Sequence, residues 1–232
     1  MKLFKEYEYN QHGNDYVIGD IHGKYELLMN ELKLINFDFK KDRLFSVGDI
    51  IDRGEDSIKC LDLIYEDWFI PIRGNHEEMM FDCTLYEYDE KTKNLLNYQW
   101  FDNGGKWYFF LPTKDEKIDV LNTIEYAFKN MPIMIQLNFP NKKIGIVHAN
   151  IIGDWNNLKE NIHMEKNQFK ALWDRKRIDE KLKDVVKNID FVYTGHSVVK
   201  EPLKLGNVFC IDTGSCFTNK LTIVNLTQLY KG

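Results

Sequence analysis

Side chains that bind metals stand directly after short apolar runs at several points along the chain. The segments are Gly19-Asp20-Ile21-His22-Gly23, Gly48-Asp49-Ile50-Ile51-Asp52-Arg53-Gly54, Arg73-Gly74-Asn75-His76-Glu77, His148-Ala149-Asn150 and Gly195-His196. Together they hold four of the six histidines. Carboxylate, imidazole and amide groups suit Mn²⁺, Fe²⁺ or Zn²⁺, and no thiolate is among them. The pattern therefore predicts a divalent metal site.

The spacing and charge of these residues indicate two ions that act on a phosphate. Asp20 and His22 are two residues apart, so in an extended segment they point to the same side and can share one ion. Two ions bring about +4, which two aspartates and a hydroxide reduce to about +1, and neighbouring arginines raise it again. Such a site attracts a dianion. A metal pair about 3.5–4 Å apart generates a hydroxide and stabilises in-line displacement on a phosphomonoester.

The elements that must position these segments alternate between strands and helices. Strands are expected at 16–18, 44–47 and 68–72, the last near a sheet edge because it contains Pro71, and each is followed by a helical pattern. A hairpin is expected from 133–137 and 144–147, a charged helical stretch at 165–190, and further strands at 191–193, 208–211 and 221–224. Ligands of open α/β sheets bind beyond the carboxyl ends of the strands, so the metal-binding loops are expected to converge.

The segment 89–130 breaks this alternation. It contains the turn Asn103-Gly104-Gly105 and an amphipathic helix from Asp115 to Asn130, and we expect it to cover one side of the sheet. Its aromatic residues are expected to pack in the core rather than to form a ligand platform: Trp100, Phe101, Trp107, Tyr108, Phe109 and Phe110.

Composition excludes several classes of protein. The chain has 232 residues, 44% of them hydrophobic, which is enough for a buried core in one domain. Its 31 basic and 36 acidic residues give a net charge of −5, which argues against sequence-independent binding of nucleic acid. The four cysteines form no C-x-x-C pair. No apolar run approaches the roughly 18 residues of a membrane span, and the first ten residues lack a signal sequence's apolar core. We expect a cytoplasmic protein without a membrane partner.

The ordered motifs GDIHG at 19–23, GDIIDRG at 48–54, GNHE at 74–77, HA at 148–149 and GH at 195–196 resemble those of the phosphoprotein phosphatase family. The likeness is greatest to the small bacterial and bacteriophage lambda-type serine/threonine phosphatases. It implies an α/β, calcineurin-like metallophosphoesterase fold: a central mixed β-sandwich flanked by helices, forming one domain over residues 1–232 with 89–130 as a mainly helical covering segment. It also implies phosphoprotein substrates and two divalent ions, with Mn²⁺ preferred over Fe or Zn.

The resemblance assigns a role to each site residue. Asp20, His22 and Asp49 would hold the first ion, and Asp49, Asn75, His148 and His196 the second, with Asp49 as the bridge. His76 would be the general acid, oriented by Asp52. The phosphate would bind to Arg53, Arg73 and Arg175, the last of these in Leu172-Trp173-Asp174-Arg175. Asn150 departs from many relatives, which have a small residue or a carboxylate after the HA pair.

The identities of single residues exclude two other kinds of active site, a P-loop and a nucleophile elbow. The GDIHGK segment has too few residues between its glycines for a P-loop, and Tyr25 replaces the Ser or Thr that would bind Mg²⁺. Val199 stands where a nucleophile elbow needs glycine. Two alternatives stay open: a diadenosine tetraphosphate or other nucleotide hydrolase on the same scaffold, which Asp52 disfavours, and an inactive phosphoprotein-binding module. His12 and His163 lie outside every motif and are expected to be surface or packing residues.

Overall fold

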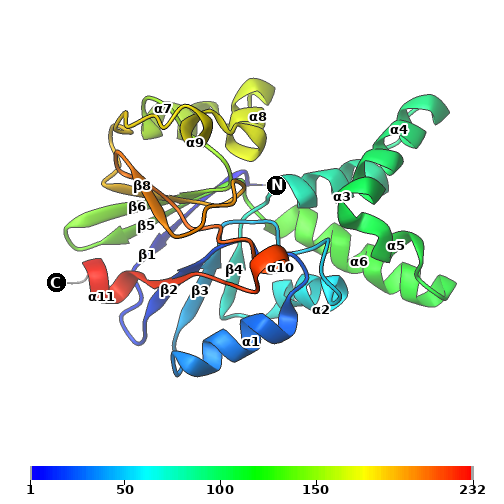
Figure 1. Cartoon of the computed structure of the whole chain (residues 1–232), viewed down its shortest axis with the longest axis horizontal. Coiled ribbons are helices and arrows are strands. Elements are labelled where there is room, and N and C mark those ends of the chain that lie inside the picture. The colour runs from blue at the N-terminus through cyan, green and yellow to red at the C-terminus, as the bar shows by residue number, and fades with distance from the viewer. Residues whose placement is uncertain (1, 231–232) are drawn as a thin grey trace.

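Two mixed β-sheets face each other in the computed structural model, which describes residues 2–230 (Figure 1). The larger sheet has the strand order β1-β5-β6-β7-β9-β8, and the smaller has β10-β2-β3-β4. The strands of the larger sheet are β1 (Phe4–Glu8), β5 (Met134–Phe139), β6 (Lys142–Val147), β7 (Phe191–Thr194), β8 (Leu203–Leu205) and β9 (Val208–Cys210). Those of the smaller sheet are β2 (Asp15–Ile18), β3 (Arg43–Ser46), β4 (Phe69–Pro71) and β10 (Ile223–Asn225).

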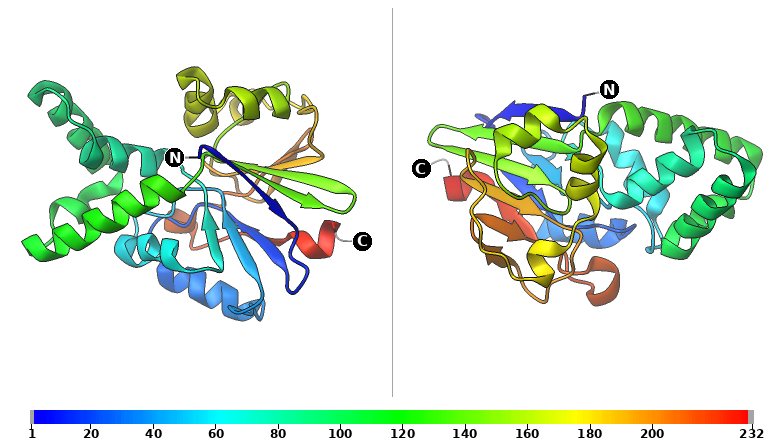
Figure 2. Two further views of the ribbon diagram at one scale, coloured as in Figure 1. Left: turned by 180° about the vertical axis from the view of Figure 1, so that it is seen from behind. Right: turned by 90° about the horizontal axis from the view of Figure 1, so that it is seen from above.

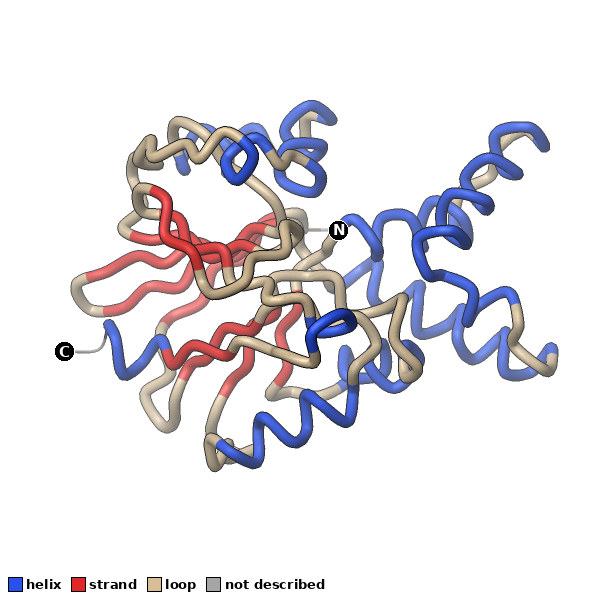
Figure 3. The backbone as a smooth tube through the Cα atoms, viewed as in Figure 1, coloured by secondary structure: helices blue, strands red, loops and turns tan. Residues whose placement is uncertain are grey.

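Helices cover the outer faces of this sandwich (Figure 3). Those that follow strands of the smaller sheet are α1 (Tyr25–Leu34), α2 (Ser57–Asp62), which continues as the 3₁₀ turn Leu63–Tyr65, and α3 (Asn75–Leu85). The larger sheet carries α7 (Trp155–Asn161), α8 (Glu165–Trp173) and α9 (Lys176–Asp179). Two short helices near the C-terminal end are α10 (Ser215–Thr218) and α11 (Leu226–Tyr230). No helix among residues 2–230 is both long and apolar enough to cross a membrane.

Apolar residues fill the space between the sheets because strands alternate their side chains. Val17 and Phe45 from the smaller sheet pack with Ile135, Ile146 and Tyr193 from the larger one. Separate apolar clusters lie on the two outer faces, under the helices. The arrangement of helices, sheet, sheet and helices confirms the expected sandwich. Apolar burial on both faces of each sheet therefore supports the strands from which the motif-bearing loops extend.

The expected strands and hairpin are present, with small shifts at their ends. β4 is an edge strand, as Pro71 predicts, and β5 and β6 form the antiparallel hairpin. The first strand, Phe4–Glu8, was not expected; it pairs in parallel with β5, about half the chain away. The predicted helical stretch at 165–190 was wrong beyond Asp179. There Arg177 binds the backbone carbonyls of Leu182 and Asp184, which holds the chain in a loop.

The segment 89–130 is mainly helical. It comprises α4 (Glu90–Trp100), a π-helical turn (Phe101–Gly105), α5 (Lys106–Phe109) and α6 (Lys114–Asn130). Asp89 caps α4, and a capping box of Thr113 and Glu116 starts α6. The helices pack on α2 and α3 and extend to one side of the sandwich (Figure 2). The helices are as expected, and Val120, Ile124 and Ala127 of α6 join the apolar cluster on the outer side of the smaller sheet.

Candidate metal centre

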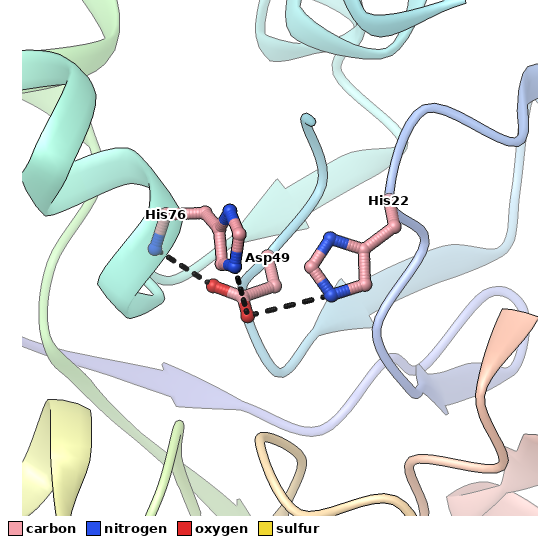
Figure 4. Close-up of side chains that lie close together, drawn as sticks. All are labelled: His22, Asp49 and His76. Atoms are coloured by element: carbon pink, nitrogen blue, oxygen red, sulfur yellow. Dashed lines mark hydrogen bonds and ion pairs between the residues drawn. The ribbon is translucent and has the colours of Figure 1, made fainter. Parts of the chain in front are cut away.

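The loops at the carboxyl ends of the strands bring the predicted metal ligands together. Asp49 lies in the middle: its Oδ2 is 3.6 Å from Nε2 of His22 and 3.9 Å from Nε2 of His76, and its Oδ1 is 3.4 Å from Nε2 of His148. Figure 4 shows the His22 and His76 rings on either side of this carboxylate. Asp49, His148 and His196 form a second group whose ligand atoms lie within 4.8 Å of one another. One carboxylate is thus shared by two candidate ion positions.

Asn75 and Asp20 complete these two groups. The amide oxygen of Asn75 lies 2.9 Å from Nε2 of His148 and 2.8 Å from Nδ1 of His196. Asp20 accepts a bond from the His196 backbone N–H at 2.9 Å through Oδ2, while its Oδ1 is buried without a hydrogen-bond partner among the described residues. Burying an unsatisfied carboxylate oxygen is costly unless a cation completes it. The donor set and this orphaned oxygen fit a pair of divalent ions.

Backbone carbonyls fix which ring nitrogen of each histidine faces the centre. His22 Nδ1 donates to Ile51 O at 3.0 Å, and His148 Nδ1 donates to Val47 O at 2.7 Å, so Nε2 of each ring carries the lone pair. His196 is turned the other way: Nε2 donates to Trp173 O at 3.1 Å, which leaves Nδ1 facing Asn75. Orienting bonds of this kind are typical of metal-binding histidines.

Burial sets the protonation of the same groups. It lowers the pKa of His22 to about 3 and that of His196 to about 3, so both rings are neutral ligands at pH 7. Burial, with Asp212 and Asp49 nearby, raises the pKa of Asp20 well above its ordinary range. Burial opposes ionisation of Asp49, but His148 and His76 outweigh it and hold its pKa well below the usual value. Cations at this position would favour the ionised form of both carboxylates.

The backbone of the site is strained in the loops that supply ligands. Left-handed conformations occur at His22 (φ 47°), Asp49 (φ 51°) and His196 (φ 64°). Such residues persist where the surrounding structure determines them strongly, and they gather at functional sites. Glycine is needed beside two of the carboxylates, because a Cβ on Gly74 would overlap Asp49 and one on Gly195 would overlap Asp20.

His76, which lies with His22 and Asp49 in the first group, also forms a hydrogen-bonded pair with Asp52. His76 Nδ1 donates to Asp52 Oδ2 at 2.7 Å, and both side chains are buried. Nε2 of His76 has no hydrogen-bond partner among the described residues and faces Asp49. A ring held through one nitrogen, with the other nitrogen directed at the centre, can exchange a proton with a group bound there.

The three predicted phosphate-binding arginines are placed differently. Arg53 reaches the centre, with NH1 2.6 Å from Nε2 of His22, and its guanidinium also lies 5.7 Å from the ring centre of Phe217. Arg175 lies beside the centre and donates to His196 O at 2.7 Å and to Ser197 Oγ at 3.2 Å.

Arg73 does not fit its expected role. Its guanidinium is 2% exposed and donates to backbone carbonyls of Met131 and Phe128 and to Glu78. The rings of Phe81 and Phe128 lie 5.0 and 4.7 Å from it. These contacts join the end of α6 to α3 and direct the charge into the protein. We therefore correct the expectation that Arg73 binds phosphate.

Sequence reasoning missed several residues of the site. Asp212 follows β9, as the other site residues follow their strands, and burial together with Asp49 raises its pKa. Glu77, quoted in a motif without a role, accepts bonds from the backbone N–H groups of Asp49, Ile50 and Gly74 at 2.7–2.9 Å and so joins two ligand loops.

Two tryptophans were also missed. Trp100 is in the core, as expected, and Trp107 packs against it, but both also donate to Asp52. No local motif marks them.

Comparison with known proteins agrees with this geometry. The model of the calcineurin-like phosphoesterase family matches residues 16–201. The chain belongs to this family. It is therefore a metallophosphoesterase, a hydrolase, and the metal-binding groups described above are those of such an enzyme.

Two relatives and one solved structure define the likeness further. The chain is 29% identical to serine/threonine-protein phosphatase 1 of Salmonella typhimurium, over 97% of each chain. It is 34% identical to the symmetrical bis(5'-nucleosyl)-tetraphosphatase of Wigglesworthia glossinidia brevipalpis, over 60% of this chain and 46% of that one. The crystal structure of a putative diadenosine tetraphosphatase shares the fold, with a TM-score of 0.64, 16% identity and coverage of 96% and 94%.

Proposed function

We propose that this protein is a metal-dependent serine/threonine protein phosphatase that hydrolyses phosphomonoesters. The observation that carries the proposal is the shared Asp49 between two ligand groups, with the His76–Asp52 pair directly beside it. The full-length similarity to a serine/threonine-protein phosphatase supports the substrate class. The likeness to a dinucleotide hydrolase covers only 60% of this chain.

The two ions would be held by the residues already described. Asp20, His22 and Asp49 would hold one ion, and Asp49, Asn75, His148 and His196 the other. We propose Mn²⁺ for both positions: carboxylate, amide and imidazole donors without a thiolate suit Mn²⁺, Fe²⁺ and Zn²⁺, and the resemblance to the phosphoprotein phosphatases favours Mn²⁺ among them. When bound, such a pair supplies a hydroxide nucleophile at neutral pH and neutralises charge on the phosphate oxygens.

The remaining chemistry belongs to side chains. Arg53 would hold the phosphate, since its planar guanidinium donates two bonds to an anion, and Arg175 would add charge from the other side of His196. His76 would act with both ring nitrogens protonated: the Nε2 proton passes to the departing serine or threonine oxygen, and the neutral ring that remains keeps its Nδ1 proton bonded to Asp52. An alkoxide is a poor leaving group, so this proton transfer matters most for the proposed substrates.

Hydrolysis with added metals tests the proposal. Metal-free protein is reconstituted with Mn²⁺, Zn²⁺ or Fe²⁺ and offered a phosphoserine peptide, a phosphothreonine peptide and diadenosine tetraphosphate. We expect metal-dependent release of phosphate from the peptides, fastest with Mn²⁺. Cleavage of the dinucleotide alone would establish the nucleotide hydrolase, and metal binding without turnover of any substrate would establish a binding module. Protein kept with chelator is the control.

We also propose a cytoplasmic location, as expected from the sequence. The support is the state of the cysteines: Cys60, Cys83, Cys210 and Cys216 are all unpaired. Unpaired cysteines are typical of proteins from reducing compartments. Fractionation of cells that produce the protein tests this, and recovery in the cytosolic fraction is the expected result.

A further inference from the structure

The carboxylate of Asp52 accepts two of its hydrogen bonds from residues outside the metal-binding loops. Trp107 Nε1 donates to Oδ1 at 2.7 Å, and Trp100 Nε1 donates to Oδ2 at 2.9 Å. Oδ2 also accepts the bond from His76 Nδ1 at 2.7 Å. Asp52 is fully buried. A buried carboxylate keeps its charge only where hydrogen bonds replace water, and the two indoles supply two of the three side-chain donors.

The two indoles, which we call the indole clamp (Trp100 and Trp107), hold each other in place. Their rings are perpendicular, with centres 5.9 Å apart. Trp100 ends α4 and Trp107 lies in α5, so the π-helical turn between them fixes their separation. An indole N–H is a donor only, so it neither titrates nor accepts a competing bond. The clamp therefore fixes both oxygens of Asp52 in one orientation.

The same turn also contacts the residue after Asp52. Arg53 N donates to Gly104 O at 3.4 Å, and a Cβ on Gly104, whose φ is 109°, would meet Arg53 N at 2.6 Å. Asp52 and Arg53 are both left-handed, with φ of 71° and 69°. Two such residues in succession need support from outside. The helical segment thus contacts the side chain of one residue and the backbone of the next.

We propose that Trp100 and Trp107 are positioning residues for proton transfer by His76, acting through Asp52. They hold the Asp52 carboxylate so that the His76 ring keeps its Nδ1 proton throughout, and a second proton, carried on Nε2, is directed at the leaving group. The inference rests on the proposed function for the role of His76 as the acid. This proposal assigns the segment 89–130 a role in catalysis that no motif in its sequence predicts.

A comparison of two substrates with different leaving groups distinguishes this positioning role from a general loss of structure, which would slow both substrates equally. Trp107→Phe keeps an aromatic ring but removes one donor, and Trp107 is only partly buried. We expect kcat for a phosphoserine peptide to fall about 10-fold, since a hydrogen bond to a charged group is lost. Turnover of 4-nitrophenyl phosphate, whose leaving group departs without a proton, should stay within about 2-fold. KM should not change for either substrate.

Trp68→Phe is the matched control. The Trp68 indole also donates to a carboxylate, Glu66 Oε2 at 3.0 Å, and is 8% exposed, but its ring packs against Phe37, Phe39 and Phe69 rather than against residues of the site. This variant should slow neither substrate. An equal loss on both substrates in Trp107→Phe, or no loss on the peptide, would overturn the proposal.

A spectroscopic measurement keeps the test independent of turnover. Nitrogen-15 spectra of the histidine rings in metal-free protein report which nitrogen of His76 is protonated. We expect the Nδ1–H tautomer in wild-type protein and in Trp68→Phe, and a mixture with the Nε2–H tautomer in Trp107→Phe. A tautomer ratio that Trp107→Phe leaves unchanged would overturn the positioning role even if the protein proves to cleave a different substrate. Wild-type protein that cleaves no phosphopeptide would instead contradict the proposed function.

Discussion

The metal-binding half of the site and the proton-donating half are built in different ways. The metal ligands stand on strand-end loops, and each is oriented by nearby backbone, as His22 is by Ile51 and His148 by Val47. The His76–Asp52 pair instead depends on Trp100 and Trp107 from the helical segment at the side. The sandwich therefore positions the candidate metal ligands, and the helical segment positions the Asp52 carboxylate that orients the proposed acid.

Removing the shared ligand should have the largest effect and should affect only the metal-binding half. Asp49→Asn takes one carboxylate from both ligand groups, so we expect both ions to be lost and turnover to fall by about 10³-fold or more. Elemental analysis of the purified variant measures the metal content. Asp174→Asn, outside both groups, is the control. A variant that retains two ions would place the bridge elsewhere.

Replacing the proton donor should affect only the other half. His76→Asn should retain the wild-type metal content and lower kcat for a phosphoserine peptide by about 10²–10⁴-fold, the contribution of a general acid. Turnover of 4-nitrophenyl phosphate should fall far less. His163→Asn, a histidine on the exposed surface, should match wild type on both substrates. Normal peptide turnover by His76→Asn would exclude this ring as the acid.

Two arginines allow a smaller and sharper comparison. Lysine lacks the planar fork of arginine, so Arg53→Lys should raise KM for phosphopeptide about 10-fold while the melting temperature stays near that of wild type. Arg73→Lys should lower the melting temperature, because bonds to Met131 and Phe128 are lost, and should change kcat/KM by less than about 2-fold in the folded protein. Thermal unfolding beside steady-state kinetics measures both. A raised KM in Arg73→Lys, together with an unchanged KM in Arg53→Lys, would show that Arg73 binds the phosphate after all.

The difference between the two halves also explains what the sequence could predict. Ligands on strand-end loops have two features that a sequence shows: their residue type and the apolar run before them. Both features were present at Asp20, Asp49, His148 and His196, so these four residues could be predicted as one site. Asp212 has the same two features after β9 and could have been found in this way. The prediction for Arg73 was wrong because a sequence motif gives the position of a residue in the chain but not the direction of its side chain. The carbonyls of Phe128 and Met131 determine that direction here, and they lie in a distant segment.

Contacts between distant segments leave no local pattern. The sequence predicts that Trp100 and Trp107 are core aromatic residues. Their N–H groups reach Asp52, about fifty residues away in the chain, through the packing of α4 on α3. The first strand was missed for a similar reason. Its five residues alternate weakly and form a strand through pairing with β5. Tertiary partners, rather than propensity, decide both cases.

Glu77, which joins two of the ligand loops, allows a final test of the metal-binding half through the pH dependence of protein stability. Burial and the nearby Asp49 raise the pKa of Glu77 to about 7 from an ordinary 4.5. Between these pH values the unfolded chain has lost the proton and the native state retains it, so the native state binds more protons and stability falls as pH rises. Between pH 4.5 and pH 7 the native state therefore loses at most about 3 kcal/mol of stability through this group.

Urea unfolding of metal-free protein at pH 4.5 to 7 measures this contribution. Glu77→Gln cannot ionise, so wild-type protein should lose stability relative to this variant as pH rises, by up to that amount. Asp20 and Asp212, whose raised pKa values act in the same direction, and His22 and His196, whose lowered pKa values act in the opposite direction, contribute to both proteins, so the difference between the two isolates Glu77. Glu125→Gln on the exposed side of α6 should follow wild type. Added Mn²⁺ should narrow the difference between wild type and Glu77→Gln, because cations favour the ionised carboxylate; parallel slopes for the two proteins without metal would show that the pKa of Glu77 is not raised.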